Sequence, residues 1–76
     1  MSVADFLIYV HPELPAQERA SLEVMLAGSV GVVSASFDKH EHPHAIVVEY
    51  NPDAVHSRQI LDIVRQHDPA ATMAGL

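Results

Sequence analysis

Histidine is the residue type in this chain with the greatest capacity for chemistry. Six histidines occur among 76 residues, at positions 11, 40, 42, 44, 56 and 67. Imidazole and carboxylate groups are ligands for Zn²⁺, Ni²⁺, Co²⁺ and Cu²⁺, whereas Cu⁺ prefers sulfur. The chain has no cysteine, which excludes thiolate ligands and disulfides. Whether the imidazoles act together depends on where the fold places them.

Hydrophobic periodicity predicts six elements in the order β-α-β-β-α-β. Strands are expected over 6–10, 32–37, 45–50 and, more weakly, 70–76. One helix is expected to open at Pro15 and to end at Gly28 or Gly31. The other should start between Asp53 and Ser57 and end at Pro69. The predicted fold is an α+β, ferredoxin-like two-layer sandwich with an antiparallel sheet of order 4-1-3-2, in one domain over residues 1–76.

Chain direction in this topology gathers the histidines at one end, because three of the connections lie there. Only His56 is expected at the opposite end. Candidate ligands for a divalent transition metal ion (Ni, Zn, Co or Cu) are His11, His40, His42, His44, His67, Glu13 and Glu18. Each histidine also has a simpler interpretation, as part of a solvated turn, a strand end or the end of a helix.

Strand alternation predicts a second candidate surface, on the sheet face opposite the helices. Leu7, Tyr9, Val32 and Val47 are expected on this open face, while Val33, Ala35 and Phe37 are expected on the other side of their strand. Apolar residues there indicate self-association or a protein partner. Met73 is expected in the core of the last strand.

Charge and motifs narrow the classes of function. Ten acidic residues against four basic ones give a net charge of −6, which opposes binding to nucleic acid and to anionic membranes. No secretory signal or membrane-spanning run is recognisable, so a cytoplasmic protein is expected. An enzyme is not expected, because nucleophile motifs, a phosphate loop and an arginine anchor are missing.

Two segments are similar to a known family. Residues 31–38 (GVVSASFD) and 48–57 (VEYNPDAVHS), followed by Ile60 and Leu61, resemble the heavy-metal-associated domains of copper chaperones and metal-pumping ATPases. The resemblance implies the ferredoxin-like fold and a metal loop that opens the first helix. In that family the loop carries a CxxC motif, which would fall near Pro15 and Glu18; neither is cysteine here.

Three functions are therefore compatible with the sequence. The first is a metal-binding domain for sensing, storage or delivery, with histidine and carboxylate ligands. The second is an interaction or oligomerisation module that has lost metal binding. The third is a small-molecule regulatory domain of the amino-acid-binding type. It ranks lower because the loop that opens the first helix lacks the glycines that usually line such a pocket.

Overall fold

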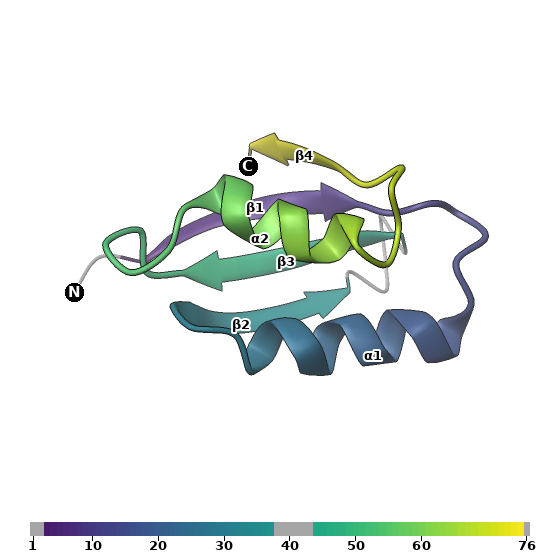
Figure 1. Cartoon of the computed structure of the whole chain (residues 1–76), viewed down its shortest axis with the longest axis horizontal. Helices are drawn as coiled ribbons and strands as arrows, with labels where there is room; N and C mark the ends of the chain where they lie inside the picture. Colours follow the sequence, from purple (N-terminus) through teal and green to yellow (C-terminus); the bar gives the residue numbers. More distant parts are fainter. Residues whose placement is uncertain (1–2, 38–43, 76) are drawn as a thin grey trace.

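Helices and strands alternate along the chain in the order β-α-β-β-α-β. A computed structural model describes residues 3–37 and 44–75. Its elements are β1 (Ala4–Tyr9), α1 (Ala16–Ala27), β2 (Val32–Phe37), β3 (Ala45–Tyr50), α2 (Ser57–Arg65) and β4 (Thr72–Gly75) (Figure 1). Gly28 forms the C-cap of α1, as expected. No helix of the described part has the length and apolar character needed to cross a membrane.

The strands form one sheet of order β2-β3-β1-β4, in which all neighbouring pairs are antiparallel. Read from the β4 edge, the same sheet is β4-β1-β3-β2. In Figure 1, α2 crosses in front of β1 and β3, and α1 runs alongside β2. A small α+β fold with a four-stranded antiparallel sheet and two helices is therefore confirmed.

The core lies between the helices and one face of the sheet. Alternation along β1 and β3 places their buried residues on the same face, because these positions pair across the two strands. The helices contribute buried residues at helical spacing. The main members of this single cluster are Phe6, Ile8, Ile46, Val48, Leu22, Leu26, Ile60, Leu61 and Val64. Both helices thus cover one face, and among the described residues no helix covers the other.

A β-bulge changes the expected alternation at the start of β2. Val32 is opposite Tyr50, but Ser34 is already opposite Glu49, so Val33 is an extra residue on β2. Val32 consequently packs against the core, and Val33 is 55% exposed. The prediction that Val32 lies on the open face, with Val33 on the core side, is wrong for this reason.

The turn before β2 requires glycine. Gly31 has a φ of 83°, a conformation that costs other residues about 1–2 kcal/mol. A Cβ added there would lie 2.7 Å from Cγ1 of Val55. The Gly31 carbonyl accepts a 2.7 Å hydrogen bond from the Asn51 N–H, which ties this turn to the end of β3.

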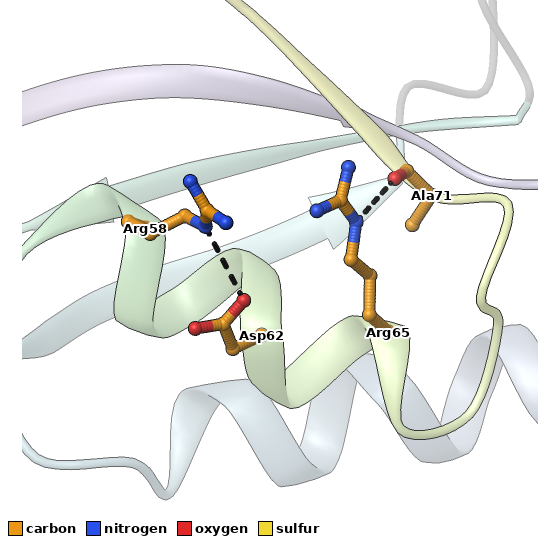
Figure 2. Close-up of polar contacts among 4 residues, drawn as sticks. All are labelled: Arg58, Asp62, Arg65 and Ala71. Atoms are coloured by element: carbon orange, nitrogen blue, oxygen red, sulfur yellow. Dashed lines mark hydrogen bonds and ion pairs between the residues drawn. The ribbon is translucent and has the colours of Figure 1, made fainter.

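Different side chains hydrogen-bond to the backbone at the two edges of the sheet. The β2 edge is partly covered by α1, because the N–H of Phe37 donates to Oε2 of Glu23 over 2.9 Å. The approach to the β4 edge is held by Arg65, whose Nε donates to the carbonyl of Ala71 over 2.9 Å (Figure 2). Met73 on β4 is 44% exposed, so its predicted place in the core is wrong: at this edge the helices do not bury it.

Candidate functional site

His11 follows β1 at the end of the sheet where the predicted metal ligands were expected. Its backbone N–H donates to Oδ2 of Asp68 over 2.7 Å, and its Nδ1 accepts the Glu13 N–H over 3.1 Å. A neutral imidazole that accepts at Nδ1 carries its proton on Nε2. A metal at Nε2 would therefore require the proton to move to Nδ1 and the bond to Glu13 to break. Local hydrogen bonding competes with metal binding by His11.

Asp68 organises this end of the molecule, although it was not among the predicted ligands. It is 6% exposed, and its second oxygen, Oδ1, accepts the Ala70 N–H over 3.1 Å. This hydrogen bond closes an Asx turn, in which an aspartate side chain accepts the backbone N–H two residues further along the chain. That local signal is visible in the sequence as Asp68-Pro69-Ala70, but the long-range bond to His11 is not.

His44 and His67 also lie at this end. The carbonyl of His44 accepts the N–H of Val10 over 2.9 Å, which places His44 beside the end of β1. Its ring is 5.9 Å from that of Tyr9, centroid to centroid. His67 follows α2, is exposed, and shares with Glu18 a hollow of about 410 Å³ that Pro15, Gln17 and Ser21 also line.

The fold thus brings these residues to the same end of the sheet, but it does not bring their side chains together around one point. Contacts join His11 to Asp68 and His44 to Val10, while Glu18 and His67 share one hollow. Within residues 3–37 and 44–75, no three His, Asp or Glu side chains lie close enough to hold one ion. The predicted ligands His40 and His42 lie outside the described residues. His56 precedes α2, where its N–H donates to Oε1 of Gln59 over 2.9 Å.

The open face of the sheet has a more continuous arrangement. The strand register places Ser36, Val47, Leu7 and Ala74 in one row across β2, β3, β1 and β4. The next row contains Tyr9, with Ala45 on one side and Thr72 on the other. Leu7, Tyr9, Val47 and Ala74 are each partly exposed; we call these four residues the apolar patch.

Two carboxylates border the apolar patch. Asp5 and Glu49 are directly opposite each other on β1 and β3, one row further along the strands, and both are exposed. The hydroxyl of Ser34 donates to Oε1 of Glu49 over 2.8 Å. We call Asp5 and Glu49 the acidic pair.

Positive charge lies elsewhere in the described chain. Arg19 is on α1 and packs against Phe37, with its guanidinium 5.9 Å from the ring centroid. Arg58 and Arg65 are on α2, where Arg58 pairs with Asp62 over 3.4 Å (Figure 2). The strand residues that form the open face, within the described ranges, therefore include carboxylates and no Lys or Arg.

Comparison of the chain with protein-family models and with curated protein sequences finds no match.

Proposed function

We propose that this chain is a ferredoxin-like domain that binds another protein through the open face of its sheet. The supporting observation is the apolar row of Val47, Leu7 and Ala74 that the register creates across β3, β1 and β4, with Ser36 at its β2 end. This row is next to Tyr9 and on the face away from both helices. The resemblance to heavy-metal-associated domains and a cytoplasmic location remain predictions.

The physical reason is the free energy of burying this row. A sheet is normally stabilised by packing its apolar face against another layer, and here only one face has such a layer. Complete burial of an exposed Leu or Val side chain contributes about 1.5–3 kcal/mol, and a partner that covers the exposed parts of Leu7 and Val47 gains a fraction of this from each. Tyrosine is also among the residues that most often contribute strongly to binding at protein interfaces. The apolar patch combines these residue types in one place.

The proposal can be tested by selecting random peptides on the wild-type domain and comparing variants. Leu7→Thr combined with Val47→Thr makes the row polar and retains strand propensity. Val24→Thr is the matched control, because Val24 is 75% exposed on α1. We expect selected peptides to bind the double variant at least about tenfold more weakly, from the lost apolar burial, and the control unchanged.

Three results would count against this function. These are selection of no binder, binders that retain full affinity for the double variant, and binders that lose affinity equally for the control. Circular dichroism of each variant establishes that the fold is retained.

A metal site at the histidine end is the second candidate, because hydrogen bonds bring His11, His44 and the His67–Asp68 turn to the same end of the sheet. Titration calorimetry with Zn²⁺, Ni²⁺, Co²⁺ and Cu²⁺ tests it. Alanine at His44 or His67 should weaken binding, and alanine at His56 should not. No heat and no thermal stabilisation with any of these ions would exclude this candidate.

A further inference from the structure

We infer that the partner of the open face is a basic amphipathic helix, with an apolar stripe that covers the apolar patch and with Lys or Arg beside the acidic pair. This inference rests on the proposed function and specifies the chemistry of the partner. Three features of the face support it: the like charges of the acidic pair, the position of the arginines, and the dimensions of the apolar row.

The acidic pair is the first feature. Directly opposite residues of an antiparallel pair have Cβ atoms about 4.5–5.5 Å apart, and like charges at such positions are destabilising. Asp5 and Glu49 occupy such positions. The Ser34 hydroxyl stabilises one oxygen of Glu49, but it carries no positive charge. A cationic side chain placed over the pair would compensate both carboxylates.

The second feature is the distribution of charge, which favours a basic partner over a second copy of this chain. The arginines of the described chain are on the helices, and the whole chain has a net charge of −6. A second copy docked face to face would bring another acidic pair and no described cation from its own open face. A basic segment brings the opposite charge, which also accelerates association.

The third feature is size. The apolar part of the row, Val47, Leu7 and Ala74, crosses three strands. These are separated by two spacings of about 4.8 Å, so it spans about 10 Å. About seven residues of α-helix, or two turns, cover this length at 1.5 Å per residue. The acidic pair is two residues further along the strands, about 7 Å away, which is within reach of Lys or Arg on the flank of such a helix. Tyr9 lies on the opposite side of the row, so the cations are expected on one flank.

A synthetic helical peptide of about 18 residues, with a leucine stripe and one lysine flank, is the probe for this inference. A second peptide has glutamate in place of each lysine. Fluorescence anisotropy at an ionic strength of about 0.1 M, where the Debye length is about 10 Å, measures both against the wild-type domain and against Asp5→Asn combined with Glu49→Gln. The control is Glu13→Gln combined with Asp62→Asn, which changes the net charge equally at exposed positions away from the sheet face.

We expect the lysine peptide to bind and the glutamate peptide not to bind. Removing the acidic pair should weaken binding by about threefold to thirtyfold, as expected for two exposed ion pairs. The control should change affinity by less than about twofold, because exposed charges beyond a Debye length of about 10 Å are screened. Leu7→Thr with Val47→Thr should also weaken binding.

The remaining outcomes separate this inference from the proposed function. If the lysine peptide depends on Leu7 and Val47 but not on the acidic pair, or if the glutamate peptide binds equally, the inference fails and the interaction face stands. Equal binding to every variant removes both. No binding to the wild type overturns the inference, while the peptide selection described above tests the function separately. A dimer in sedimentation that Leu7→Thr with Val47→Thr dissociates would replace the basic helix with a second copy.

Discussion

Asp68→Ala should be among the most destabilising substitutions of a polar residue in this domain, because Asp68 is buried. The carboxylate joins two parts of the chain that are 57 residues apart, through the 2.7 Å bond from the His11 N–H. It also accepts the Ala70 N–H over 3.1 Å. A hydrogen bond to a charged group contributes about 1.5–3 kcal/mol and a typical intramolecular one about 0.5–1.5 kcal/mol; we assign the larger value to the long-range bond and the smaller one to the local, partly buried bond with Ala70. The expected loss is therefore about 2–4 kcal/mol.

This loss is large for a chain of this size. At about 0.05–0.15 kcal/mol per residue, the total stability of the domain is about 4–11 kcal/mol. With a urea dependence of about 1 kcal/mol per molar, the lower end of the expected loss moves the unfolding midpoint by about 2 M. Urea titration followed by circular dichroism measures this shift. Faster hydrogen exchange of the His11 amide should accompany it, because its acceptor has been removed.

Asp62→Ala is the matched control. Its side chain is 58% exposed and makes one 3.4 Å contact with Arg58 on the same helix, so the change in stability should stay within about 0.5 kcal/mol. A stability for Asp68→Ala within about 0.5 kcal/mol of wild type, or unchanged exchange at His11, would refute the role of the Asp68 carboxylate.

Three further predictions concern β2 and its surroundings. Val32→Asp should destabilise the domain by about 1–3 kcal/mol, because it places a carboxylate against the core at a partly buried position. Val33→Asp should cost less than about 1 kcal/mol, and the reverse order in urea titrations would contradict the bulge. Gly31→Ala should cost at least about 1–2 kcal/mol from the left-handed backbone alone, and a thermal midpoint equal to that of wild type would show that the turn relaxes freely. Glu23→Ala should cost about 1–3 kcal/mol by removing the acceptor of the Phe37 N–H, while Glu23→Gln, which keeps an acceptor oxygen, should restore most of this stability; equal losses for the two variants would exclude the hydrogen bond as the cause.

Much of the fold could be predicted from the sequence because local patterns determine it. The alternation of Phe6 and Ile8 on β1, and the helical spacing of Leu22 and Leu26 on α1, identify faces that are buried as expected. The bulge could not be predicted in this way. One extra residue in β2 reverses the face of every residue before it, and two adjacent valines give no signal of which one is extra.

The histidine end illustrates a second limit. Strand direction is enough to predict that His11, His44 and His67 lie at one end, but side-chain convergence depends on local competition. The bond between His11 Nδ1 and the Glu13 N–H is one such competitor. Strand direction also places Asp68 at this end, but its hydrogen bond with the His11 N–H could not be predicted from spacing. Strand alternation correctly predicted that Leu7 and Val47 lie on the open face. It was wrong for Val32, because of the β-bulge at the start of β2.

The hydrogen bond between Glu23 and Phe37 links two causes of aggregation, an exposed hydrophobic core and an exposed edge strand. Helix α1 covers part of the hydrophobic core, and its Glu23 also accepts a backbone N–H of the edge strand β2. Unfolding of α1 would therefore expose both hydrophobic core residues and the backbone of the β2 edge strand. Colloidal stability of this small domain should consequently track the integrity of one helix: substitutions that weaken α1, such as Ala20→Gly, should promote fibre formation at temperatures where the remaining elements are still ordered.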